Sequence, residues 1–313
     1  MKQNITSIAF ANIRGVAVGN AQDIEAATGV TVFRLTVPSS AAVKVFGGGP
    51  ASRETEAIAP ERSHPLNALV FSGGSAYGLA AADGVMHSLE VHGVGYDTGF
   101  ARIPIVCQSC IYDLGYGKAD IRPTAKMGYS ACEASFVAND PRSGNIGAGI
   151  GATVGKAAGM ERAQKSGIGY AALQFEELQI GVAVVLNSYG DVYYKGNKIA
   201  GMLTPNHTAF DDSYNRLLQQ SGENLFVSTT NTTLASVFTN GDFSSAQLHH
   251  IAQMASAGLA RSINPAFTSA DGDTIYAVSI GEKANKVSAN YDAVGSLAAA
   301  LLEDAISDAI HHV

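Results

Sequence analysis

Tryptophan is absent from this chain of 313 residues, and charged residues make up only 15% of it. Soluble proteins average about 25% charged residues, so much of this chain is expected to be buried in a core or in contacts between subunits. Apolar residues reach 46%. This excludes a disordered chain, because disorder requires few apolar residues and high charge.

Positive charge is also scarce. Lys and Arg number 20 against 27 Asp and Glu, which gives a net charge of −7, and no basic tract is present. Nucleic acid is therefore not an expected partner, because binding to phosphates requires clustered basic residues. No apolar run approaches the ~20 residues of a membrane-spanning helix. The first ten residues, MKQNITSIAF, lack the apolar segment of a signal peptide, so we expect a cytoplasmic protein.

Cysteine occurs only three times, as Cys107, Cys110 and Cys132. That number suits a reducing compartment and excludes a disulfide framework. Cys107 and Cys110 have C-x-x-C spacing, but zinc would need two further ligands and no second pair exists. We therefore expect no metal, and we interpret these cysteines as small buried apolar residues.

No Pro/Gly/Ser linker and no internal repeat divides the chain, so residues 1–313 are predicted to form a single domain. β-branched and apolar runs predict strands at residues 29–37 (continued by 43–46), 67–71, 181–186 and 225–239, and a return strand at 191–195 that pairs with 181–186 as a hairpin. Apolar spacing predicts helices at residues 76–91, after a Ser244/Gln247 capping box, and from about 293 to the end. These elements do not alternate regularly, which favours a layered α+β sandwich over a doubly wound parallel sheet.

The glycine-rich segment does not fit a nucleotide site. Residues 147–152 satisfy G-x-G-x-x-A but follow a loop instead of the first strand of a βαβ unit. Residues 151–157 are one residue short of a phosphate loop and carry Ala157 where Ser or Thr would hold magnesium. We therefore expect no cofactor. Lys156 lies within this flexible backbone, which can bring its ammonium group to an active centre.

Two further patterns contain reactive side chains: Asn231-Thr232-Thr233-Leu234 in a β-rich stretch, and Asp271-Gly272-Asp273 about forty residues later. From spacing alone, the first is an ordinary strand. The second is a hairpin turn or a weak calcium loop.

The order of these and other motifs along nearly the whole chain resembles the family of self-cleaving aminopeptidases and amidases that includes DmpA, the β-aminopeptidases and the nylon-oligomer hydrolase NylC. The motifs are Arg53-Glu54-Thr55, residues 69–79 (LVFSGGSAYGL), Gly95–Gly99, Arg102–Ile105, Tyr112–Gly115, Arg122–Tyr129, Gly144–Lys156, Asn231–Leu234, Gly258–Arg261 and Asp271–Asp273. The resemblance implies a four-layer αββα sandwich and cleavage of the Asn231–Thr232 bond into residues 1–231 and 232–313. No metal or organic cofactor is needed, and the family forms homotetramers.

The resemblance also implies roles for individual residues. Thr232 would attack the preceding carbonyl and then act as an N-terminal nucleophile, with its own new α-amine as the base. Asp271 and Asp273 would orient Thr232 and stabilise its ammonium form, and Asp at both positions is similar to the nylon-oligomer branch. Asn187 would donate to the oxyanion, and Lys156 and Tyr112 would line the cleft.

The identity of the active-site lysine and the function remain open at this point. Lys165 competes with Lys156 as the active-site lysine, because residues 164–169 differ from the Lys-Gly-Gly-Leu-Gly of many relatives. The leading function is hydrolysis of amide bonds in small peptides, amino acid amides or ω-amino acid (6-aminohexanoate-type) oligomers. The two alternative functions are those of an acyltransferase of the ornithine acetyltransferase type and of a non-catalytic relative with the same fold.

Overall fold

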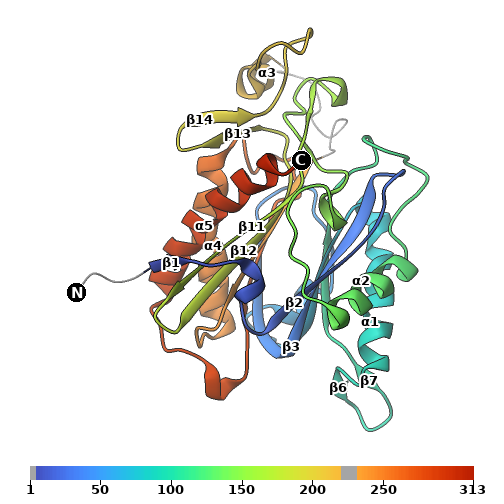
Figure 1. Cartoon of the computed structure of the whole chain (residues 1–313), viewed down its shortest axis with the longest axis vertical. Coiled ribbons are helices and arrows are strands. Elements are labelled where there is room, and N and C mark those ends of the chain that lie inside the picture. The colour runs from blue at the N-terminus through green and yellow to red at the C-terminus, as the bar shows by residue number, and fades with distance from the viewer. Residues whose placement is uncertain (1–4, 220–230) are drawn as a thin grey trace.

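Ten strands form one hydrogen-bonded sheet that is folded into two layers (Figure 1). The computed structural model describes residues 5–219 and 231–313. The order along the sheet is β1-β11-β12-β15-β17-β3-β5-β8-β4, with β2 also paired to β3. The bounds are Ile5–Ser7 (β1), Val16–Asp23 (β2), Thr28–Val45 (β3), Ala51–Arg53 (β4), Leu66–Ser72 (β5), Val106–Cys110 (β8), Ile168–Phe175 (β11), Leu178–Asn187 (β12), Thr232–Thr239 (β15) and Thr274–Ser279 (β17).

The long strand β3 belongs to both layers. Its first part pairs with β2 and β5, and its last six residues pair with β17. The register shifts between Arg34 and Ser39, a stretch that contains Pro38, which has no N–H to donate to a neighbouring strand. The strand therefore changes partners at this point.

Two pairs of helices cover the outer faces, with α4 and α5 on one side and α1 and α2 on the other (Figure 1). Side-chain alternation along β15 explains this arrangement. Leu234 and Phe238 pack into a core shared by the two sheets, whereas Ala235 and Val237 pack into the core that includes α4 and α5. A third core joins the other sheet to α1 and α2. The predicted αββα sandwich is confirmed. The helices are Ala81–Val91 (α1), Ala125–Val137 (α2), Ser245–Ser262 (α4) and Tyr291–His311 (α5).

Shorter elements lie around these layers. They are Tyr96–Asp97 (β6), Arg102–Ile103 (β7), Thr153–Val154 (β9), Gln164–Lys165 (β10), Asp191–Tyr194 (β13), Asn197–Ala200 (β14), Ile263–Asn264 (β16) and the helix Ser213–Gln219 (α3). The 3₁₀ turns are Phe10–Asn12 (η1), Thr55–Ile58 (η2), Ser75–Ala80 (η3), Gly147–Gly149 (η4), Met160–Arg162 (η5) and Lys283–Asn285 (η7).

Most of the predicted elements are confirmed. The capping box of α4 is complete, since the Ser244 hydroxyl accepts from the Gln247 N–H and the Gln247 side chain accepts from the Ser244 N–H. The predicted strands 29–37 and 43–46 are one strand, β3. Of the predicted β stretch 225–239, residues 232–239 form β15, and residues 225–230 lie outside the described residues.

The predicted helix at residues 76–91 is wrong in its first part, where the chain forms η3. The side chain of Gln108 explains the difference. Its amide nitrogen donates to the carbonyl of Gly78 at 2.7 Å, and its amide oxygen accepts from the N–H of Ala82 at 3.1 Å. The carbonyl of Gly78 and the N–H of Ala82 would bond to each other in an α-helix. Gln108 takes both groups, so the α-helix begins only at Ala81.

The predicted hairpin between residues 181–186 and 191–195 is also wrong. β12 already has β11 on one edge and β15 on the other, so neither edge is open to a return strand. The turn pairs with the glycine-rich segment instead, because Gly155 donates to the carbonyl of Gly190 and Lys156 to that of Tyr189. β13 then pairs with β14 and β16 in a separate small sheet.

Candidate active site

Three segments from distant parts of the sequence meet at one end of β15. Thr232, the first residue of this strand, pairs with Asn187, the last residue of β12. β17 runs parallel to β15 on its other side, so the Asp271–Asp273 segment directly before β17 lies at the same end. The fold therefore brings together these residues, which the sequence analysis predicted as one site.

The Asn231–Thr232 bond is buried, and two groups contact its carbonyl oxygen. The Thr232 hydroxyl donates to the carbonyl of Asn231 in a short contact, and the backbone N–H of Gly272 donates to the same oxygen at 3.3 Å. Asn231 and Thr232 are only 3% and 4% exposed. The hydroxyl thus lies against the carbonyl group that it would attack in the predicted cleavage.

Asn187 connects the strand end to three neighbouring residues. Its side-chain oxygen accepts from the ammonium of Lys156 at 2.7 Å and from the N–H of Thr153 at 3.1 Å. Its amide nitrogen donates to the backbone carbonyl of Tyr112 at 3.0 Å. An amide nitrogen carries two hydrogens, so donation to an oxyanion requires the second one. The predicted roles of Asn187 and Tyr112 stay predictions.

Lys156 is buried beside this asparagine. Its ammonium also donates to the backbone carbonyl of Asn187 at 3.0 Å. Burial lowers the pKa of Lys156 to about 7, although the carboxylates of Asp271, Asp273 and Asp113 oppose that shift. A lysine with this pKa is partly neutral near neutral pH and can accept a proton there.

The two aspartates are held by backbone donors. Asp273 accepts from the N–H of Thr233 at 2.6 Å and from that of Phe267 at 3.1 Å. Asp271 accepts from the N–H and the hydroxyl of Thr268. Burial, with the neighbouring Asp271 as a second cause, raises the pKa of Asp273 to about 8, and burial raises the pKa of Asp271. Through its hydrogen bond with the Thr233 N–H, Asp273 contacts the residue directly after the candidate nucleophile.

Asp273→Asn is expected to flatten the pH dependence of stability. The folded pKa of Asp273, about 8, lies above its unfolded value of about 3.9. The folded chain therefore holds a proton that the unfolded chain releases, and this contribution is lost as the pH rises towards 8. Denaturant unfolding in a Thr232→Ala background, which lacks the hydroxyl of the predicted cleavage, should show the stability of the variant rising relative to that of its parent between about pH 5 and about pH 8. Curves of stability against pH that run parallel for the two proteins would contradict this assignment. Groups that titrate alike in both proteins do not affect the difference between the curves.

Lys165, the competing lysine, lies on β10, and its ammonium contacts the glycine-rich segment. Its ammonium donates to the carbonyls of Gly149, Ala152 and Ser166 and lies 5.5 Å from the ring centre of Tyr116. Burial lowers the pKa of Lys165 to about 7 as well. Of these two lysines, only Lys156 contacts Asn187, and only its pKa is affected by the charges of Asp271 and Asp273. The geometry favours Lys156 as the active-site lysine.

Asp113 is a buried carboxylate to which the sequence reasoning gave no role. It accepts from the Thr28 hydroxyl and from the Gly74 N–H, both at 2.7 Å, and burial raises its pKa. Its charge acts on both Lys156 and Lys165. The only signal in the sequence is its place in the motif Tyr112–Gly115.

The other sequence motifs have structural roles, as expected. Burial raises the pKa of Cys107 and of Cys110 to about 12, so both remain thiols at neutral pH. In the glycine motif, the N–H of Gly147 donates to Gln22 and that of Ala148 to Thr31. Side chains of the protein thus occupy donors that a phosphate would need. Residues 5–219 and 231–313 contain no cluster of metal-ligating side chains.

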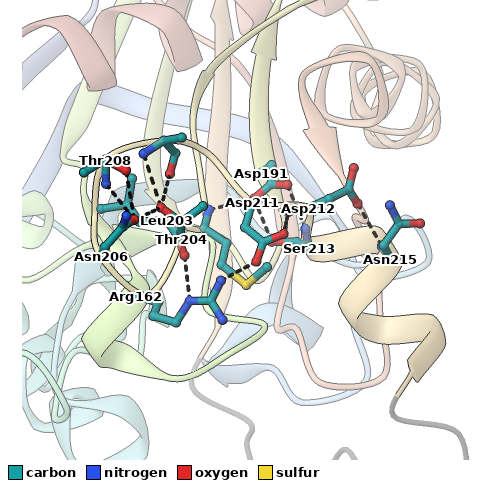
Figure 2. A network of polar contacts seen from close by, with 12 residues as sticks. Arg162, Asp191, Leu203, Thr204, Asn206, Thr208, Asp211, Asp212, Ser213 and Asn215 are labelled. Atoms are coloured by element: carbon teal, nitrogen blue, oxygen red, sulfur yellow. Dashed lines mark hydrogen bonds and ion pairs between the residues drawn. The ribbon is translucent and has the colours of Figure 1, made fainter.

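A polar network joins Arg162 and Asp191 to the segment of residues 202–213 (Figure 2). Arg162 donates to the carbonyl of Leu203 and pairs with Asp211. Asp191 is 1% exposed and pairs with Lys198 at 2.7 Å. It also accepts from the Met202 N–H and from both the N–H and the hydroxyl of Ser213. The sequence reasoning assigned no role to this network.

Asp191→Ala is expected to lower the free energy of unfolding by about 3 kcal/mol, because it leaves the buried donors of Met202 and Ser213 without their acceptor and the partly buried ammonium of Lys198 without its carboxylate. Denaturant unfolding in the Thr232→Ala background measures this change. Asp83→Ala is the matched control, since Asp83 forms an exposed pair with Arg53 and should cost about 1 kcal/mol or less. Equal losses in the two variants would show that the Asp191 network does not stabilise the fold.

Solved structures identify the fold class. The L-aminopeptidase D-Ala-esterase/amidase of Ochrobactrum anthropi, described as a variant of the Ntn hydrolase fold, has a TM-score of 0.69 at 18% identity and aligns over 97% of this chain and 86% of its own. A β-aminopeptidase of Burkholderia sp. has a TM-score of 0.66 at 20% identity, over 96% of this chain and 85% of its own. This chain therefore has an Ntn-hydrolase-type fold.

The family is identified from the sequence. Peptidase family S58 matches residues 9–312, and the chain belongs to that family. An uncharacterized aminopeptidase of Mycobacterium leprae is 37% identical over 295 residues, which cover 86% of this chain and 78% of that protein. A 6-aminohexanoate-oligomer endohydrolase of Kocuria sp. is 29% identical over 316 residues, 94% of this chain and 84% of that protein. The predicted family resemblance is confirmed, and the protein is a hydrolase.

Within the described ranges 5–219 and 231–313, no helix combines the length and the apolar composition needed to cross a bilayer.

Proposed function

We propose that this protein cleaves its own Asn231–Thr232 bond and then uses Thr232 as an N-terminal nucleophile to hydrolyse amide bonds. The observation that carries the proposal is the contact between the Thr232 hydroxyl and the Asn231 carbonyl oxygen, at a buried position beside two aspartates and a lysine. A threonine in an ordinary strand does not need such surroundings.

The cleavage proceeds in two steps, formation of an ester and its hydrolysis. The Thr232 oxygen attacks the carbonyl carbon of Asn231 and loses its proton. The C–N bond then breaks, the nitrogen takes up a proton, and an ester links the two residues. Water next attacks the ester carbon, which leaves a carboxylate on Asn231 and restores the hydroxyl of Thr232.

The new terminus explains how the cleaved enzyme would turn over. The α-amine of Thr232 has an ordinary pKa of about 7.7–8.0, so it accepts the hydroxyl proton at neutral pH, when a substrate amide is attacked. Asp273, which contacts the N–H of Thr233, would hold this end of the strand. A new ammonium beside it favours the ionised carboxylate, which would then stabilise the ammonium form. The acyl group of the substrate then passes to water through an ester on Thr232.

The substrates follow from the reaction and from the family. We propose small peptides, amino acid amides or ω-amino acid oligomers, because the similar proteins are described as an aminopeptidase and a 6-aminohexanoate-oligomer endohydrolase. We also propose a homotetramer of cleaved protomers, which native mass spectrometry tests directly.

The chemistry is tested by release of amines from a panel of these amides, together with trapping of the acyl-enzyme. Acid quenching during turnover should leave the acyl group on the fragment that begins at Thr232. An acyl group on another residue, or the absence of any hydrolysis by fully cleaved protein, would contradict the proposal. Addition of ornithine to the reaction identifies an acyltransferase, since the acyl group would then appear on the added amine.

A further inference from the structure

Gly272, between the two aspartates, contacts both reacting groups of the bond that we propose is cleaved. Its N–H donates to the carbonyl oxygen of Asn231 at 3.3 Å. A Cβ at this position would lie 2.7 Å from the hydroxyl oxygen of Thr232, closer than real Cβ contacts. Its lack of a side chain therefore leaves the space in which that hydroxyl lies.

We infer that Gly272 is required for self-cleavage, because its N–H stabilises the oxyanion that forms on Asn231 and its missing side chain keeps the Thr232 hydroxyl in its attacking position. This inference rests on the proposed function. As Thr232 attacks, the carbonyl oxygen gains negative charge, and a donor that is already in place is worth more to that state than to the uncharged carbonyl. A single such donor changes reaction rates by about 10²–10³.

The surroundings of Gly272 determine which group must move if a side chain is added. The other close neighbours of the added Cβ are backbone atoms, the carbonyl oxygen of Gly49 at 2.9 Å and the Cα of Pro50 at 3.2 Å. The Thr232 hydroxyl is on a side chain that can rotate about χ1. Gly272→Ala is therefore expected to rotate the nucleophile away from the carbonyl, together with a small shift of the Gly49 carbonyl, while the N–H remains.

The test compares Gly272→Ala with Gly49→Ala in the full-length chain. A Cβ on Gly49 meets only the carbonyl oxygen of Asp271, at an ordinary 3.8 Å, so this variant lies next to the site without a clash. We expect Gly272→Ala to slow the appearance of the two fragments about 100-fold, because a nucleophile displaced by about 1 Å loses that much rate. Gly49→Ala should cleave at the wild-type rate.

Hydroxylamine locates the defect within the reaction, since it splits the ester directly. It should not restore the rate of Gly272→Ala, because the slow step is formation of the ester. Restoration to the wild-type rate, or cleavage of Gly272→Ala as fast as Gly49→Ala, overturns the inference. Failure of the wild-type chain to cleave at all contradicts the proposed function instead.

A second measurement does not depend on how Gly272→Ala folds. A crystal structure of the full-length Thr232→Ala chain should show the Gly272 nitrogen within hydrogen-bond distance of the Asn231 carbonyl oxygen, close to the 3.3 Å found here. A separation too large for a hydrogen bond overturns the inference.

Discussion

Thr232→Ala is expected to leave a single chain of 313 residues with no amidase activity. The variant lacks the hydroxyl that contacts the Asn231 carbonyl, so no ester forms and no α-amine is released. Both the nucleophile and its base are absent for the same reason. Denaturing mass analysis after long incubation at neutral pH measures the first effect, and amine release from small amides measures the second.

Thr232→Ser is the matched control, because serine keeps the hydroxyl and loses only a methyl group. It should retain part of both activities. Cleavage that persists in Thr232→Ala would contradict the account and would point to Asn231, whose buried side-chain amide has no hydrogen-bond partner among the described residues. The nitrogen of that amide can attack the backbone carbonyl carbon of Asn231 itself. This breaks the Asn231–Thr232 bond and leaves a succinimide at residue 231, a route that needs no hydroxyl.

Lys156→Met is expected to slow self-cleavage about 100-fold or more, the effect of losing a positioned general base. Before cleavage the nitrogen of Thr232 is an amide and cannot accept the hydroxyl proton, so another base is required. Lys156 has a pKa lowered to about 7 by burial and contacts Asn187, the strand partner of Thr232. The wild-type rate should therefore rise with pH up to about 7 as Lys156 loses its proton, and the variant should lack this rise.

Lys165→Met provides the matched control for that experiment. Burial lowers the pKa of Lys165 to a similar value, but its ammonium contacts backbone carbonyls of the glycine-rich segment. We expect its rate and pH profile to remain close to those of the wild type. If Lys165→Met removes the pH dependence of self-cleavage and Lys156→Met does not, Lys165 and not Lys156 is the active-site lysine.

Much of the fold could be predicted because local patterns decide it. The β-branched and apolar residues of β15 and the capping box of α4 are visible in the sequence, and both elements occur as expected. The errors arose where a distant residue competes with a local preference. Gln108 interrupts the start of one helix, and the occupied edges of β12 prevent a hairpin. Neither effect is encoded near the residues that it changes.

The site was predictable in part for the same reason. The family motifs named Thr232, Asn187 and the two aspartates, and the fold places them at one end of β15. Spacing alone could not connect Asn231 with Gly272, which are 41 positions apart, because that contact depends on parallel pairing of β15 with β17. The buried Asp113 and the Asp191 network depend equally on contacts between distant segments.

The first residue and the mass of the smaller fragment in purified wild-type protein test the central claim most directly. The account predicts a fragment that begins at Thr232 and contains 82 residues, which is what remains of 313 when 231 are removed. A fragment that begins at any other residue, or a chain that stays whole after long incubation at neutral pH, would contradict it.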